Sequence, residues 1–292
     1  MSFRLTFVLV FLLMVPASQA QDQLRWKFQS NDTVKYQVVQ NMQSTTAFGD
    51  EELKSTFIQA IDMTWQVLAV GANGDVQLNQ IFDRVRLKME GGPAGTIEFD
   101  TASGEAAESP VVRELAMVFG NIVNQKFQVQ MAQDGQIEQV VIPPKLLEAV
   151  KASTAGQQGA LNEKVLNDMM KQSAVILPTQ PVSPGSEWTS EQTVQMPFGE
   201  MTITSQMKYV QKDPTGNAII DFVPTVRITP REGTAAKMTL ESSTGRGRIV
   251  FDVDQGRVNR TQLDLTMQIT VESNGRKLPQ TIRNRTTMTL VP

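Results

Sequence analysis

The chain has 292 residues, a formal net charge of −3, and neither cysteine nor histidine. Without cysteine it can form no disulfide, thiol nucleophile or Cys-bound metal site, and without histidine it can form no Ser-His-Asp site and no imidazole ligand set. The acidic balance argues against nucleic acid and anionic lipid surfaces as partners. We therefore expect a fold held together by its apolar core alone, with no cofactor and no metal.

The first twenty residues have the order of regions that is typical of a secretory signal peptide. Arg4 precedes an unbroken apolar run from Phe7 to Val15, and the small-residue sequence Ser18-Gln19-Ala20 follows. The run is short for a transmembrane helix, which takes about 20 residues, and no later stretch approaches that length. We expect cleavage after Ala20, no transmembrane segment, and a periplasmic or secreted location.

Alternation of apolar and polar residues predicts strands in the next part of the chain. A first strand is expected over residues 33–46, followed by a long hairpin whose turn is GANGD at residues 71–75. In the second arm of this hairpin the alternation changes phase near Ile81 and Phe82. This change predicts a β-bulge.

Three helical stretches are expected in the middle of the chain. Ser109-Pro110 begins a helix whose apolar residues recur at spacings of three and four. A short hairpin, FQVQMAQDGQIEQVVI, comes next. Pro143-Pro144 then begins the helix KLLEAV, and a third helix runs from Leu161 to Met170.

The second half of the chain repeats the strand order of the first. A strand at residues 187–196 leads to a hairpin around DPTGN, with a second phase change expected after Phe222, and LDLTMQITV then pairs with the last strand through Asn274-Gly275. The segment PTQPVSPGS before it has the composition of a linker. We predict three parts: the signal peptide at residues 1–20, a β-meander with a helical insert at 21–177, and a second β-meander at 178–292.

Two similar stretches support an internal duplication. GTIEFDTASG, at Gly95–Gly104, and GRIVFDVDQG, at Gly247–Gly256, both fit G-x-I-x-F-D-x-x-x-G. A calcium loop is disfavoured, because Gly256 is the fifth residue counted from Asp252 and not the sixth. We expect instead that Phe99 and Phe251 are buried, that Asp100 and Asp252 cap turns, and that each final glycine has positive φ.

The predicted fold class is α+β: mainly antiparallel β, with two copies of a β-meander and about three central helices packed against them. The two copies form either one curved sheet or two similar domains. No pair of carboxylates is singled out for a glycosidase mechanism. We therefore expect a protein without enzymatic activity and without catalytic residues.

Several stretches together resemble a family of exported bacterial proteins of unknown function. They are GTIEFDTASG, VVRELAMVFGNIVNQ, KFQVQMAQDGQIEQVV, PGSEW and GRGRIVFDVDQGRV, and the resemblance covers nearly the whole chain after the signal peptide. It implies no activity and no catalytic residues. The expected architecture, a curved sheet with a few helices against it, is similar to that of periplasmic lipoprotein carriers.

The supply of apolar residues suggests a ligand cavity between sheet and helices. Methionine is common on the expected strand and helix faces, and its flexible side chain suits irregular apolar space. We predict that an apolar ligand, a lipid or a lipidated partner binds there; the alternatives are a structural or protein-interaction module of the cell envelope and, third, an enzyme. The expected lining residues are Leu115, Phe119, Ile122, Leu166, Met169 and Met170.

Overall fold

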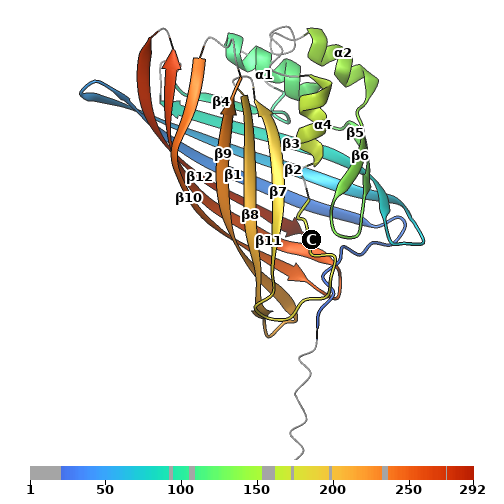
Figure 1. Cartoon of the computed structure of the whole chain (residues 1–292). Helices are drawn as coiled ribbons and strands as arrows, with labels where there is room; N and C mark the ends of the chain where they lie inside the picture. The colour runs from blue at the N-terminus through green and yellow to red at the C-terminus, as the bar shows by residue number, and fades with distance from the viewer. Residues whose placement is uncertain are drawn as a thin grey trace, which may run out of the picture.

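One antiparallel sheet of twelve strands dominates the computed structural model of the chain (Figure 1). The structure describes residues 21–91, 95–104, 109–152, 162–171, 174–196, 199–231, 236–273 and 275–292. The predicted signal peptide lies outside the described residues. Of the two architectures expected from the sequence, one curved sheet is observed.

The strands follow a simple order across the sheet: β6-β5-β3-β2-β1-β12-β11-β10-β9-β8-β7, with β4 paired to β3. The strands are β1 (Thr33–Phe48), β2 (Glu51–Val70), β3 (Val76–Gly91), β4 (Ile97–Asp100), β5 (Lys126–Met131), β6 (Ile137–Val141), β7 (Glu187–Met196), β8 (Gly199–Lys212), β9 (Asn217–Pro230), β10 (Ala236–Asp252), β11 (Arg257–Ser273) and β12 (Arg276–Val291). Two consecutive meanders are thus joined through the pairing of β1 with β12. Internal duplication and the predicted division into parts stay predictions.

Three helices form in the described part of the middle region, as the apolar spacing predicts: α1 (Pro110–Gly120), α2 (Pro144–Ala152) and α4 (Glu163–Lys171). Ser109 caps α1 by accepting a hydrogen bond from the Val112 N–H at 3.1 Å. Helix α4 contacts both β6 and β7, the two outermost strands of the sheet (Figure 1). The curved sheet is therefore bridged by a helix at the place where its edges approach.

The strand register confirms one predicted irregularity and corrects another. A register shift occurs where Asp62 and Met63 of β2 meet Phe82 and Arg84 of β3, so the predicted bulge in β3 is present. The phase change predicted after Phe222 is wrong. The described pairing of β9 with β8 runs unbroken from Phe222 to Pro230, and Pro224 occupies the same face as Phe222.

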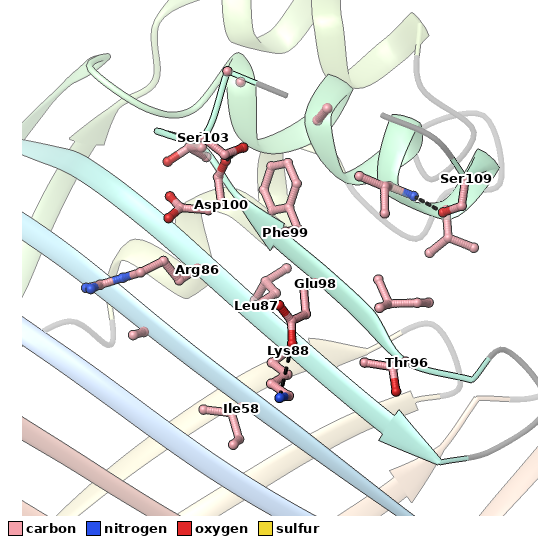
Figure 2. A pocket seen from close by; sticks show the side chains of 18 residues that line it. Ile58, Arg86, Leu87, Lys88, Thr96, Glu98, Phe99, Asp100, Ser103 and Ser109 are labelled. Carbon is pink, nitrogen blue, oxygen red and sulfur yellow. Dashed lines mark hydrogen bonds and ion pairs between the residues drawn. The ribbon is translucent and has the colours of Figure 1, made fainter. Parts of the chain in front are cut away.

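The first of the two repeated motifs lies at the edge of the sheet beside α1. Phe99 pairs with Leu87 in the far half of β3, and its ring points toward α1, where it contacts Phe119 with 6.0 Å between ring centroids (Figure 2). Asp100 accepts the Ala102 N–H at 2.9 Å, and Gly104 has a φ of +64°. The turn is as predicted, but Phe99 is only half-buried, because β4 has a neighbouring strand on one side alone.

The second motif lies at the other end of the sheet. Phe251 pairs with Ala218 at the beginning of β9 and is fully buried. Asp252 accepts the N–H groups of Asp254 and Gln255 at 3.0 and 2.8 Å, and Gly256 has a φ of +61°. The two motifs form the same turn, but they do not hold equivalent places in their meanders.

The chain segment at residues 21–28 covers the end of the sheet that holds Phe251. Its backbone bonds to three regions: Asp22 to Val182 at 2.7 and 2.8 Å, Trp26 to Gln133 at 2.9 Å, and Lys27 to Gly256 at 3.1 Å. The Trp26 indole N–H also donates to the Val175 carbonyl at 3.0 Å. We call this region, formed by residues 21–28 and 174–186 with the strand ends beneath them, the sealed end.

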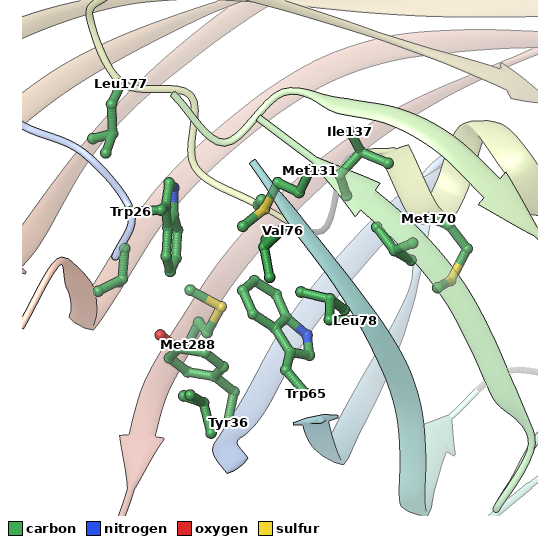
Figure 3. Close-up of a cluster of buried hydrophobic side chains, with 14 of the residues drawn as sticks. Trp26, Tyr36, Trp65, Val76, Leu78, Met131, Ile137, Met170, Leu177 and Met288 are labelled. Carbon is green, nitrogen blue, oxygen red and sulfur yellow. The ribbon is translucent and has the colours of Figure 1, made fainter. Parts of the chain in front are cut away.

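Aromatic side chains fill the sealed end (Figure 3). Trp26 lies 5.5 Å from Trp65 and 6.1 Å from Phe251 between ring centroids, and Tyr36 lies 5.2 Å from Trp65. All four side chains are almost completely buried. Burial of aromatic area on this scale stabilises a fold strongly, so the sealed end is the part of the core that anchors the sheet.

Candidate functional site

A cavity of about 540 Å³ lies between the inner face of the sheet and the helices. Its walls come from β1, β2, β3, β5, β7, β8, β9, β10, β11 and β12, from α1 and α4, and from residues 174–176. The volume falls within the range of about 300–1,000 Å³ that is usual for small-molecule sites. We refer to it as the cavity.

The cavity exists because small side chains meet across neighbouring strands. Ser190 of β7 pairs with Ser205 of β8, and Ser205 pairs with Pro224 of β9. All three line the cavity. On the next strand, a Cβ atom added to Gly245 would lie only 2.7 Å from Pro224 Cγ. This row of small residues leaves space where large residues would fill the core.

The rest of the lining is mostly apolar and includes methionines from four different elements. These are Met63 of β2, Met170 of α4, Met207 of β8 and Met288 of β12. Cross-strand partners share one face of a sheet, so the register places further methionines on the same inner face. Those that the pairing assigns to it are Met42, Met89, Met131, Met196, Met201, Met238 and Met267.

The polar groups of the cavity are all uncharged. Gln59, Gln192, Ser190, Ser205, Thr261 and Thr286 contribute amides and hydroxyls, and no described lining residue is Asp, Glu, Lys or Arg. Thr261 Oγ1 is buried and has no hydrogen-bond partner within the described structure. A buried hydroxyl without a partner costs free energy, so this atom is available to a bound molecule.

Four of the six lining residues predicted from the sequence border the cavity: Phe119, Ile122, Leu166 and Met170. Leu115 is half-buried on α1 and is not among the lining residues. Met169 belongs to α4, but its side chain lies outside the described residues. The structure thus brings together residues of α1 and α4, and whether they bind a ligand stays a prediction.

The sequence reasoning missed most of the strand residues that line the cavity. Examples are Ile203, Phe222 and Leu263, which lie on three strands of the second meander. The sequence shows that these residues alternate with other side chains, and it places three of the lining methionines, Met63, Met207 and Met288, on expected strand faces. What the sequence lacked was the register, which decides which rows of side chains meet.

A second hollow, of about 870 Å³, lies beside α1 and opens along β4 (Figure 2). Its charged side chains all have ion-pair partners: Lys88 pairs with Glu98 at 3.1 Å within the lining, and Arg86 and Asp100 pair with the neighbouring Asp62, at 2.7 Å, and Arg84. The hydrogen bond from Arg84 is the main reason that the pKa of Asp100 is lowered to about 2. These pairs have the character of a solvated strand edge, and we do not consider this hollow the main site.

The described residues offer no metal cluster and no membrane-spanning helix. Within them, no group of three or more Asp and Glu side chains is placed to hold a metal ion. Asp252, the residue for which a calcium role was considered, uses its carboxylate to cap its own turn. None of the described helices combines the length and the apolar character that crossing a bilayer takes.

The fold is similar to that of lipovitellin, in a structure solved to describe lipid–protein interactions. The TM-score is 0.51 at 11% sequence identity, and the likeness covers 91% of this chain and 26% of lipovitellin. The chain therefore spans about a quarter of that protein's length. At this low identity the likeness concerns the fold alone.

Two other structures give much lower scores. An outer membrane channel from Pseudomonas putida F1 matches with a TM-score of 0.32 at 8% identity, over 94% of this chain and 98% of the channel. A DUF1329 family protein from Desulfovibrio piger matches with a TM-score of 0.15 at 10% identity, over 85% of this chain and 83% of that one. Both scores are too low to indicate a shared fold. No curated protein matches the sequence.

One protein family matches the sequence directly, over residues 73–258. The matched region runs from the second arm of the first hairpin to the first residues of β11, so it includes the helices and both repeated motifs. It covers more than half of the chain, and the expectation of a family without assigned activity is confirmed. The chain belongs to DUF6263, a family of unknown function.

Proposed function

We propose that this protein binds an apolar ligand, a lipid or a lipidated partner, in the cavity between the curved sheet and the helices. The cavity carries the proposal, because its lining is mostly apolar, has no charged side chain among the described residues and includes methionines from four elements. Methionine adapts to ligands of irregular shape. The protein is a binding protein and not an enzyme in this proposal.

The sealed end supports this function by keeping one end of the sheet rigid. Large aromatic side chains pack there and are almost completely buried, while small side chains meet further along the same inner face. A molecule in the cavity would thus lie next to Met63 and Met288, on the side of the cavity that faces the sealed end. Helix α4, which contacts both outer strands, covers it from the side.

Two further observations agree with the proposal. Lipovitellin, whose lipid–protein interactions its structure describes, has a similar fold. The segment before Asp22 has the pattern of a signal peptide, so we place the protein in the periplasm or outside the cell. Its partners would then be lipids or lipidated proteins of the envelope. The common strand order of the two meanders supports our further suggestion that they arose by duplication.

Binding can be tested with N-phenyl-1-naphthylamine, an uncharged probe that fluoresces in apolar surroundings. We expect the detergent-free protein to bind it, and Ser205→Trp, which fills the row of small residues, to weaken binding at least tenfold. Gln206→Trp is the matched control, because Gln206 is the next residue of β8 and is exposed on the opposite face. Circular dichroism would check that both variants keep the fold.

Native mass spectrometry of the protein isolated from its own host complements the probe. A mass increase that disappears on organic extraction would support a resident lipid. A ligand-free mass together with no binding of the probe would contradict the proposal. Recovery of a protein partner by crosslinking in the envelope would then favour the structural or protein-interaction module instead.

A further inference from the structure

The side chains that line the cavity also indicate which chemical class of ligand it accepts. This inference rests on the proposed function. Its lining combines apolar side chains with the amides of Gln59 and Gln192 and the hydroxyls of Ser190, Ser205 and Thr261. The described residues of the lining include no cation that could pair with a carboxylate or phosphate, and no anion that could pair with an amine. An ionised group placed inside would therefore stay unpaired.

Unpaired charges are costly in such surroundings. Moving an ionised group from water into an apolar site without a partner costs several kcal/mol. Moving a hydroxyl or ester there costs little free energy if the group forms a hydrogen bond in the site. Thr261 Oγ1 is buried and lacks a partner within the described structure. The hydroxyl of Thr261 can donate a hydrogen bond to a ligand oxygen or accept one from a ligand hydroxyl. The lining therefore suits an uncharged polar group of the ligand and disfavours an ionised one.

The apolar part of the lining indicates the rest of the molecule. Met63, Met170, Met207 and Met288 reach the cavity from three strands and a helix, so flexible side chains surround it on several sides. The inner face also continues beyond the cavity with methionines such as Met42 and Met267. Such walls suit a flexible hydrocarbon chain whose length can vary.

We propose that the ligand is an uncharged long-chain lipid, such as a fatty alcohol or an ester, whose hydroxyl or ester group binds inside the cavity beside Thr261. Charged lipids of the same chain length are excluded by the absence of a counter-charge. The proposal goes beyond apolar binding, because it assigns both the charge state of the head group and its place.

Three probes with the same chain test this selectivity: dodecan-1-ol, dodecanoate and dodecylammonium, each below its micelle concentration. Their displacement of N-phenyl-1-naphthylamine from the wild-type protein would give relative affinities. We expect the alcohol to bind at least tenfold more tightly than either ion. Equal affinity for all three would overturn the proposal, since it would place the head group in solvent, while the proposed function would stand. If neither the fluorescent probe nor the alcohol bound, the proposed function itself would fail.

A lysine placed in the cavity sharpens the test. Thr286 lines the cavity from β12 and pairs with Leu263, two residues from Thr261 on the same face of β11, so Thr286→Lys should improve the affinity of dodecanoate relative to the alcohol by about tenfold. Gln206→Lys puts the same charge on the opposite face of β8 and should leave the ratio unchanged. Failure of Thr286→Lys to change the ratio, in a folded variant, would place the head group away from Thr261 and contradict the proposed site.

Discussion

The two repeated motifs make the same turn in two very different settings. Asp100 and Asp252 each cap a turn of their own backbone, and Gly104 and Gly256 have nearly the same positive φ, +64° and +61°. At the first motif no atom of the described residues lies within 4 Å of a Cβ added to the glycine, whereas at the second the added atom would lie 2.5 Å from the backbone nitrogen of Lys27. The turn of the second motif therefore packs against Lys27, whereas the turn of the first does not pack against described residues at its glycine. We call the second motif docked and the first motif free.

The phenylalanines differ in the same way. Phe251 is completely buried beside Trp26 in the sealed end, while Phe99 is half-buried on a four-residue edge strand and contacts α1. Local sequence fixes the turn, because capping and positive φ depend on a few neighbouring residues. Burial depends on which other parts of the chain pack against the motif, so we expect the two motifs to contribute differently to stability.

The largest expected effect of a single change in this comparison is at Phe251. Phe251→Ala should lower the free energy of unfolding by about 3–5 kcal/mol, because it opens a cavity among rigid aromatic neighbours. Phe99→Ala is the matched change in the other motif and should cost about 1–2 kcal/mol, because that side chain is already half exposed. Urea denaturation measures both.

Equal losses for the two variants would contradict the distinction between a docked and a free motif. A larger loss for Phe99→Ala would place the anchoring core beside α1 and not at the sealed end. The sequence alone predicts equal, large losses, since it predicts that both rings are buried.

Much of the sheet could be predicted because its signals are local. The alternation in β2 and β11, the bulge in β3 and the Ser109-Pro110 start of α1 each depend on a short stretch of residues. The error after Phe222 has a local cause too, since Pro224 is an unusual strand residue and hid an unbroken alternation.

The cavity could not be predicted in the same way. Ser190, Ser205 and Pro224 are small residues in three different strands, and they become neighbours only through the register. Likewise, Leu24, Trp26 and Phe28 alternate with Arg25 and Lys27 as in a strand, yet this pattern does not show that Trp26 is central to the sealed end. Both features arise from long-range pairing, which a single sequence does not specify.

The next largest effect is expected at the two glycines. Gly256→Ala should lower the free energy of unfolding by about 2 kcal/mol, because alanine is disfavoured at positive φ and its Cβ would displace Lys27. Gly104→Ala meets only the backbone penalty and should cost about 1 kcal/mol. Thermal unfolding followed by circular dichroism would rank the two, and a larger loss for Gly104→Ala would refute the docking of residues 21–28 on the second motif.

The smallest expected effect on stability concerns the ion pair between Arg84 and Asp100, a residue of the free motif. The hydrogen bond from Arg84 lowers the pKa of Asp100 to about 2, from an unfolded value of about 3.9. Because the folded pKa is the lower one, ionised Asp100 favours folding above pH 4, and this contribution is lost as the pH falls through the folded pKa. Arg84→Gln should therefore move the pKa of Asp100 toward its ordinary value and reduce stability slightly at pH 7, and the difference from wild type should shrink as the pH falls from 4 through 2.

Lys88→Gln is the control for this change, because Lys88 lies on the same face of β3 but pairs with Glu90 and Glu98. It should leave the pKa of Asp100 unchanged in an NMR titration of the carboxyl carbons. Both residues of the Arg84–Asp100 pair are partly exposed, with side-chain exposures of 42% and 26%, so solvent screens much of their interaction. The effect on stability should therefore be smaller than that of Gly104→Ala; a larger one would mean that this surface pair, and not the buried aromatic core, is a main support of the edge strand.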